Sequence, residues 1–233
     1  MSIIVLQHDA NNRPGRLGAT FRDHGLDLDV RKLHEGDAVP SDLDNVRGVI
    51  SLGGKPNVDE GHAWIQPELE LLRAAHEAEL PVVGVCLGHQ MIAKALGGEV
   101  GKMDEPEIGF KPVDIAVPGQ TDIMLAGVPW RSSLLHIHSY EVKAPPPGAI
   151  VLASSEATKV QIFRAGLRTF GFQFHMEADM GIIRDIARAI DGQVLQQFES
   201  EAEEHYDRFA LIGNRLSVNL VSFCFPFSSL TAV

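Results

Sequence analysis

The sequence is poor in cysteine, in long apolar runs and in positive charge. Its two cysteines, Cys86 and Cys224, lie far apart, which argues against a disulfide framework and makes a reducing cytoplasm the expected location. No apolar run approaches the ~20 residues that span a bilayer, so we expect no membrane segment. Lys and Arg number 20 against 31 Asp and Glu, a formal net charge of −11. This balance offers no general basic surface to nucleic acid and favours a small molecule or a protein as partner.

Internal repeats, low-complexity linkers and a signal peptide are also missing. The N-terminus, Met1–Gln7, is apolar but lacks a basic start and leads at once to His8 and Asp9, which is typical of a first strand. A length of 233 residues suits one well-buried domain, and 45% hydrophobic with 22% charged residues is an ordinary globular composition. We assign residues 1–195 to one domain and residues 196–233 to a C-terminal helical and apolar extension.

Short apolar runs alternate with helical patterns through the first half of the chain. The expected strands are Ser2–Gln7, Leu28–Leu33, Gly48–Leu52 and Val82–Val85, and the expected helices are Arg16–His24, Pro67–Glu79 and Gly88–Leu96. Such alternation predicts an α/β fold whose central sheet is mostly parallel and covered on both faces.

The second half of the chain has a different pattern. Short strands separated by Pro and Gly turns are expected at Val113–Val117, Ile150–Ala153, Val160–Phe163 and Thr169–Phe174. We expect them to add antiparallel strands at one edge of the sheet. Met180–Phe209 is helical in pattern, and the apolar segment Ser217–Phe225 leaves three interpretations open: an edge strand, a docking segment or a tail.

Cys86 stands between an expected buried strand and an expected helix, in the segment Gly84-Val85-Cys86-Leu87-Gly88. A nucleophile there lies on a sharp turn, and the flanking glycines leave room for a strained backbone. The N-terminus of the following helix favours the thiolate, and the Leu87 N–H is suited to donate to an oxyanion. Most free cysteines are small buried hydrophobic residues, and Cys224, which lacks this setting, is predicted to be one of them.

A cysteine nucleophile needs a base, and the base needs an orienting group. His175 ends an alternating apolar strand and Glu177 follows two residues later, so extended backbone would direct both side chains to the same side. An imidazole can exchange protons at neutral pH, and a carboxylate fixes its tautomer. Most His-x-Glu pairs are structural, so this one gains weight only beside Cys86. Gly53-Gly54, after the third strand, suits a second oxyanion donor or a tight turn equally well.

These segments together resemble the class I glutamine amidotransferase domain, in particular that of GMP synthase and its free-standing relatives. The matching segments are Leu52-Gly53-Gly54-Lys55-Pro56, Gly84 to Gln90, Glu107-Ile108-Gly109-Phe110, His138-Ser139-Tyr140-Glu141-Val142 and Gly171 to Glu177. They extend over roughly Ile3 to Ile190. The order and content of several motifs, and no single one, make the resemblance specific.

The resemblance implies a flavodoxin-like three-layer fold, a Cys86–His175–Glu177 triad and no cofactor. It further implies an oxyanion hole from the Gly54 and Leu87 N–H groups. Glutamine or a γ-glutamyl relative would be the substrate, held by Gly53, Gln90, Ser139 and Tyr140 and hydrolysed through a γ-glutamyl thioester. Two residues depart from the family pattern: Lys55 precedes Pro56 where proline more often comes first, and Met176 replaces the usual proline between His175 and Glu177.

The sequence leaves the acceptor of the released ammonia open. The ~40 residues after Ile190 are too few for an ATP-pyrophosphatase domain. We therefore expect either a separate synthase subunit that accepts ammonia or a free-standing γ-glutamyl peptidase without ammonia transfer. A non-catalytic regulatory subunit that keeps the fold is a third interpretation, disfavoured because all three triad residues are present. A zinc site from His89, His136, His138 and His175 is also disfavoured, because nothing in the sequence supports its ligand geometry.

Overall fold

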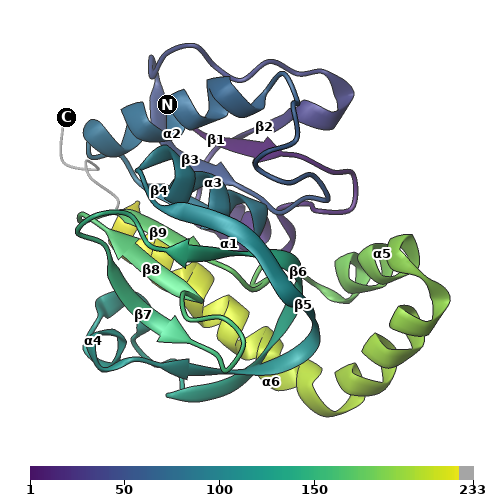
Figure 1. Ribbon diagram of the computed structural model, residues 1–233. Helices are drawn as coiled ribbons and strands as arrows, with labels where there is room; N and C mark the ends of the chain where they lie inside the picture. Colours follow the sequence, from purple (N-terminus) through teal and green to yellow (C-terminus); the bar gives the residue numbers. More distant parts are fainter. Residues whose placement is uncertain (226–233) are drawn as a thin grey trace.

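The structure, a computed structural model, describes residues 1–225, and strand and helix alternate through its first half (Figure 1). This half contains β1 (Ser2–Gln7), α1 (Gly15–Asp23), β2 (Leu28–Lys32), β3 (Val46–Ser51), α2 (Ile65–Glu77), β4 (Val82–Val85) and α3 (Leu87–Ala95). These elements confirm the predicted ones to within two residues at each end. Gly97, after α3, has φ +86°, the left-handed conformation expected of a helix C-terminus.

The second half contributes long antiparallel strands and two long helices. These elements are β5 (Glu99–Ile115), α4 (Val117–Gln120), β6 (Arg131–Ala144), β7 (Ile150–Ser154), β8 (Ile162–Ala165), β9 (Thr169–Phe172), α5 (Met180–Ile190) and α6 (Gly192–Cys224). Within residues 1–225 the strands form one sheet in the order β2-β1-β3-β4-β9-β8-β7-β5-β6. The pairs from β2 to β9 are parallel and those from β9 to β6 are antiparallel. The predicted α/β fold with added antiparallel strands is confirmed.

The sheet is covered on both faces because its inner strands alternate apolar side chains between two cores. In β1, Ile3 and Val5 pack into the core shared with α1, α5 and α6, whereas Ile4 and Leu6 pack against α2 and α3. The inner parallel strands β1 and β4 are therefore nearly continuous apolar runs, whereas the parallel edge strand β2 carries Asp29, Arg31 and Lys32. This sandwich fixes the carboxyl ends of β1, β3, β4 and β9 along one edge.

The long hairpin of β5 and β6 was largely missed: the predicted strand Val113–Val117 covers only the end of β5 and runs into α4, and no strand was predicted at β6. β5 carries Asp104, Glu105 and Pro106 in its middle, residues that are uncommon in strands. The pairing shifts at this point: Lys102 lies opposite Tyr140, and Glu107 already lies opposite His138. The extra residues of β5 bulge away from the ladder, which explains why the hydrophobic pattern did not reveal a continuous strand.

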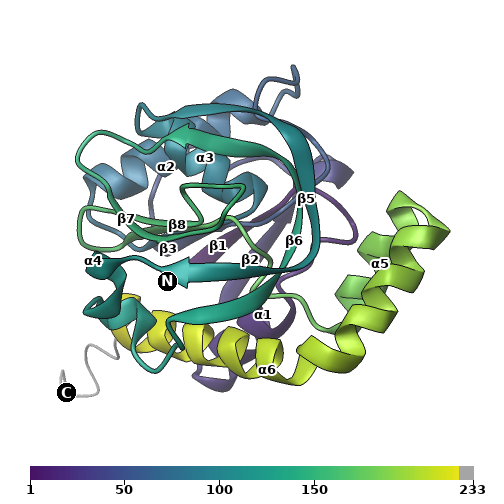
Figure 2. The same ribbon diagram turned by 60° about the horizontal axis from the view of Figure 1, so that its bottom comes forward.

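Helix α6 crosses beneath the sheet over 33 residues (Figure 2). Its end includes Ser217–Cys224, so the edge-strand interpretation of this segment was wrong. The segment is helical because Leu220, Val221 and Cys224 recur at helical spacing on the buried face. Burial raises the pKa of Cys224 to about 12, which suits a packing role. None of the helices within residues 1–225 combines the length and apolar character needed to cross a membrane.

Candidate active site

Cys86 occupies a sharp turn between β4 and α3. Its φ of 51° and ψ of −104° are strained for a residue with a side chain, and its N–H is held by the Phe172 carbonyl oxygen at 2.8 Å. The flanking glycines are required by close contacts. A Cβ on Gly84 would lie 2.4 Å from the Gly88 carbonyl oxygen, and one on Gly88 would lie 1.9 Å from the Ser51 carbonyl oxygen. The turn therefore depends on the glycine spacing seen in the sequence.

His175 and Glu177 follow β9, which runs parallel to β4, so they lie at the same sheet edge as Cys86. The His175 Nδ1 is 2.9 Å from a Glu177 carboxylate oxygen, and both side chains are almost fully buried. The His175 N–H donates to the Leu135 carbonyl oxygen at 2.9 Å, which fixes the backbone of this segment. This contact between His175 and Glu177 forms although the residue between them is Met176 and not the proline usual in the family.

The surroundings of His175 favour its charged form. Burial alone would lower its pKa, but the negative charges of Glu177 and Cys86, together with hydrogen bonds to both, raise the pKa of His175 well above its ordinary value. A cysteine sulfur beside an imidazolium that is itself backed by a carboxylate is an arrangement suited to nucleophilic attack and proton transfer.

The Gly53-Gly54 loop lies directly against this group. A Cβ on Gly53 would be 2.8 Å from the His175 Cε1 and 3.5 Å from the Cys86 Cβ, and one on Gly54 would be 3.3 Å from a Leu87 methyl group. The two glycines therefore bring backbone beside Cys86, where side chains would obstruct it. The Gly88 N–H donates to the Leu52 carbonyl oxygen at 3.1 Å and ties this loop to the start of α3.

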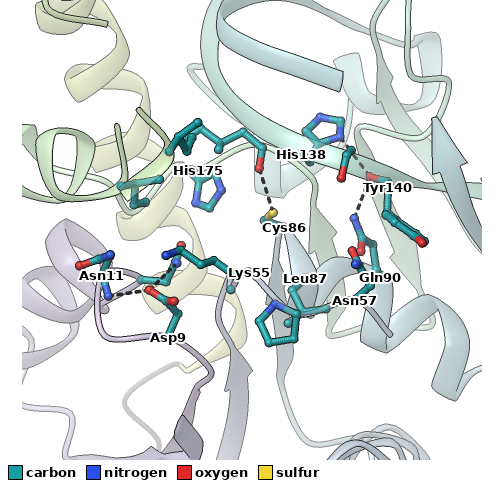
Figure 3. A pocket seen from close by; sticks show the side chains of 17 residues that line it. Asp9, Asn11, Lys55, Asn57, Cys86, Leu87, Gln90, His138, Tyr140 and His175 are labelled. Carbon is teal, nitrogen blue, oxygen red and sulfur yellow. Dashed lines mark hydrogen bonds between the residues drawn. The ribbon is translucent and has the colours of Figure 1, made fainter. Parts of the chain in front are cut away.

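The residues predicted from the sequence meet at one cavity of about 130 Å³. Its lining includes Gly54, Cys86, Leu87, Gln90, Ser139, Tyr140 and His175, whereas Gly53 and Glu177 lie behind the wall. Figure 3 shows His175 on one side of Cys86, and Gln90 and Tyr140 on the other. The Cys86 sulfur lies 3.7 Å from the Ile137 carbonyl oxygen, and the Gln90 Nε2 donates to the Tyr140 carbonyl oxygen at 2.8 Å.

Several lining residues were not predicted from the sequence. Asp9, Asn11 and Asn12 follow β1, and Ile186 and Ile190 come from α5. The sequence could have indicated Asp9, Asn11 and Asn12, because polar residues that follow a parallel strand gather at the carboxyl edge of the sheet. It could not have indicated the two isoleucines, since their spacing is that of any helix packed on a core.

A second buried polar group lies behind the Gly53-Gly54 loop and was also not predicted. The Glu68 carboxylate, fully buried on α2, contacts the His8 Nε2 at 2.7 Å and accepts a hydrogen bond from the Ser51 hydroxyl at 2.6 Å. A Cβ on Gly54 would lie 2.7 Å from the His8 Cβ. This group therefore supports the loop from below.

The histidines considered for zinc do not converge as a set. His89 packs on the Phe163 ring at 4.8 Å, while His175 faces Glu177. His136 and His138 do lie together, with Glu107 as their neighbour. Within residues 1–225, these last three form the one group of His, Cys, Asp and Glu side chains whose ligand atoms are close enough for a shared metal ion.

Comparisons with known proteins identify relatives of this chain. The sequence profile of the family described as "Glutamine amidotransferase class-I" matches residues 16–185. A glutamine-hydrolyzing GMP synthase subunit of Archaeoglobus fulgidus is 34% identical over 68% of this chain and 79% of that protein. Gamma-glutamyl peptidase 3 of Arabidopsis thaliana is 28% identical over 77% of this chain and 74% of that protein.

Solved structures share the fold. The crystal structure of a glutamine amido transferase from Methylobacillus flagellatus has a TM-score of 0.84 at 21% identity, covering 95% of this chain and 94% of its own. For some relatives the match is partial: it spans 29% of the Aeropyrum pernix GMP synthase, at 36% identity and 67% of this chain. The profile match over most of the chain shows that this protein belongs to the class I glutamine amidotransferase family.

Proposed function

We propose that this chain hydrolyses the side-chain amide of glutamine or of a γ-glutamyl relative through a γ-glutamyl thioester on Cys86. The observation that carries the proposal is the position of Cys86, on a strained turn that opens into the cavity, beside His175, whose Nδ1 contacts the Glu177 carboxylate. The parallel strands β4 and β9 bring a thiol, an imidazole and a carboxylate to one point. This combination supports nucleophilic catalysis better than a packing role.

The mechanism follows from this geometry. The Cys86 thiolate attacks the carboxamide carbon, and the Gly54 and Leu87 N–H groups stabilise the oxyanion that forms. The C–N bond breaks as His175 gives its proton to the leaving nitrogen, which releases ammonia or an amine and leaves the thioester. Water then attacks the thioester while His175 takes a proton, and glutamate leaves as the thiolate is restored. Glu177 keeps the imidazole oriented and stabilises its charged form.

The other side of the cavity suits the amino-acid end of the substrate. Gln90 offers its side-chain amide there, and Ser139 and Tyr140 offer backbone groups. Gly53, which has no side chain, leaves space beside Cys86. Several relatives are named as glutamine-hydrolyzing subunits of GMP synthase, which motivates the proposal that ammonia passes to a separate synthase subunit. No cofactor is needed for either half of the reaction, because every step is a proton transfer or an acyl transfer.

A γ-glutamyl peptidase is the second candidate. The cavity is also lined by Asp9, Lys55 and the α5 residues Ile186 and Ile190, and Figure 3 shows Asp9 and Lys55 on the same side of Cys86 as His175. Because His175 would protonate the leaving nitrogen, this is the side on which a leaving group larger than ammonia would lie. The similarity to the Arabidopsis peptidase motivates the same test.

Incubation of the purified chain with glutamine, γ-glutamyl dipeptides and glutathione distinguishes the candidates, with Cys86→Ala as the control. Ammonia release from glutamine that requires Cys86 would support the amidotransferase reaction. Amine release from γ-glutamyl peptides would support the peptidase. Equal product release by Cys86→Ala would contradict both, since each needs this thiolate.

A further inference from the structure

Glu107, on β5, is a buried carboxylate with an unusually complete set of partners. One oxygen accepts a hydrogen bond from the Ser155 hydroxyl at 3.0 Å, and the other accepts from the Thr158 hydroxyl at 2.9 Å and from the Gln161 Nε2 at 3.0 Å. Burial opposes its charge, but the hydrogen bonds from His138 and Thr158 and the nearby histidine charges lower its pKa to about 2. The carboxylate is therefore charged and rigidly held.

His138 connects this carboxylate to the cavity wall. Its Nε2 lies 3.1 Å from the second Glu107 oxygen, and its Nδ1 lies 3.1 Å from the Tyr140 carbonyl oxygen. The His138 Nε2 also lies 3.3 Å from the Nδ1 of His136. The Tyr140 carbonyl also accepts from the Gln90 Nε2 at 2.8 Å. One continuous series thus runs from Glu107 through His138 and Tyr140 to Gln90.

The series stands where the backbone ladder is interrupted. Between the pairs Lys102–Tyr140 and Glu107–His138, the register of β5 and β6 shifts, and Ser139 lies opposite the bulged residues. Regular ladder pairing therefore does not fix Ser139, although its neighbours His138 and Tyr140 are paired. A rigid side-chain contact has to replace this pairing if the backbone is to hold a ligand in one position.

We propose that Glu107 is a positioning residue, which acts through His138 to fix the wall that binds the amino-acid end of the substrate. This inference rests on the proposed function, because it assigns the 138–140 wall and Gln90 to the substrate. Glu107 does not touch the reacting atoms. Its removal should weaken binding of the α-amino and α-carboxylate groups and leave the Cys86 chemistry intact.

Steady-state kinetics of Glu107→Gln test the proposal with glutamine and two truncated analogues. Glutaramate lacks the α-amino group, and γ-aminobutyramide lacks the α-carboxylate. We expect the KM for glutamine to rise about tenfold, with kcat changed less than about twofold, because a contact made equally in ground and transition states is lost. The KM penalty should shrink for at least one analogue. The rate of Cys86 alkylation by iodoacetamide should stay at the wild-type value.

The matched control is Glu201→Gln. The Glu201 carboxylate accepts a hydrogen bond from the Phe110 N–H of the same strand at 2.7 Å and has no part in the series, so its KM should not change. If Glu107→Gln does not fold, Ser155→Ala removes one donor to Glu107 and should raise the KM by a smaller factor. An unchanged KM, a loss of kcat alone, or an equal penalty for glutamine and both analogues would overturn the proposal.

Two measurements separate this inference from its premises. Calorimetric binding of glutamine to Cys86→Ala, with and without Glu107→Gln, needs no turnover. A tenfold weaker affinity would support the positioning role even in a chain that hydrolyses nothing, and no difference would overturn it.

Metal analysis of the purified protein tests whether Glu107, His136 and His138 bind a metal ion instead. Stoichiometric zinc that is lost in Glu107→Gln would overturn the positioning role in favour of a metal site.

Discussion

At the scale of single residues, Cys86 shows how strain and glycine spacing produce a reactive position. Its left-handed φ costs about 1–3 kcal/mol, and the structure tolerates this because backbone contacts on both sides fix the turn. The sulfur is thereby held at the end of a helix, beside His175 and against the Gly53-Gly54 loop. A cysteine in a regular strand would direct its sulfur into one of the two cores.

Glu177→Gln tests the role of the carboxylate behind His175. The glutamine keeps the size of the side chain but loses the charge that raises the His175 pKa, so the imidazolium should be less stable. We expect turnover to fall by about 10²–10⁴, and the pH–rate profile to move with the lowered His175 pKa. Initial rates across pH check this. A wild-type rate with an unchanged profile would remove Glu177 from the mechanism.

Gly88→Ala tests the packing of the turn. The new Cβ would lie 1.9 Å from the Ser51 carbonyl oxygen, which is backbone and cannot move aside without disturbing β3. We expect a loss of about 1–3 kcal/mol or more in the free energy of unfolding, measured by urea denaturation. Gly61→Ala is the control, because a Cβ there meets nothing within 4 Å, and it should change stability by less than about 0.5 kcal/mol. Equal stabilities for the two variants would contradict this explanation of the turn.

At the scale of elements, the site depends on parallel strands that end together. The carboxyl ends of β1, β3, β4 and β9 supply Asp9, Gly53, Cys86 and His175 in turn. Helices α2 and α5 complete the surroundings, the first through Glu68 and the second through the isoleucines of the cavity wall. Each element contributes one or two groups, and the fixed register of the sheet sets their separation.

Glu68→Ala tests the support that α2 gives to the Gly53-Gly54 loop. The substitution leaves His8 and Ser51 without their shared partner in a fully buried position. A buried hydrogen-bonding group left without its partner costs about 1–3 kcal/mol, which thermal or urea unfolding would detect. Glu70→Ala, at an exposed position of the same helix, should cost less than about 0.5 kcal/mol. A Glu68→Ala chain as stable as Glu70→Ala would show that the buried pair is not a structural support.

The elements also show how much the sequence could predict. The parallel half followed from the alternation of apolar strands with helical patterns, and the roles proposed for Cys86, His175 and Glu177 followed from motifs at strand ends. The β5–β6 hairpin did not, because its bulge interrupts the hydrophobic period. Residues such as Glu68 and Ile186 gave no signal either, since a polar or apolar residue on a helix does not reveal which neighbour it meets across the fold.

At the scale of the whole molecule, the buried histidines make stability depend on pH. Burial lowers the pKa of His89 and of His136 to about 3, so below pH ~6.5 the unfolded chain binds protons that the folded chain does not. Stability is therefore lost as pH falls from ~6.5 toward 3. The raised pKa of His175 acts in the opposite sense: its contribution is complete below pH ~6.5 and is lost as pH rises through the folded-state pKa.

His89→Gln should therefore flatten the acid side of the stability curve. The glutamine cannot titrate, so the free energy of unfolding should fall less steeply between pH ~6.5 and ~4.5, a window above the ordinary pKa of the carboxylates. Urea denaturation at a series of pH values measures this slope. A slope equal to that of the wild type would show that His89 does not contribute to acid destabilisation.

Intact mass spectrometry after rapid acid quenching of a reaction with glutamine is the decisive test of the proposed chemistry, because it detects the thioester itself. We expect the wild-type chain to gain the mass of one glutamyl group, peptide mapping to locate it on Cys86, and Cys86→Ala to stay unmodified. His175→Ala should lose most of the signal, since attack and proton transfer act as one unit. Turnover of glutamine without an adduct on Cys86, or with undiminished rate in Cys86→Ala, would contradict the proposed mechanism.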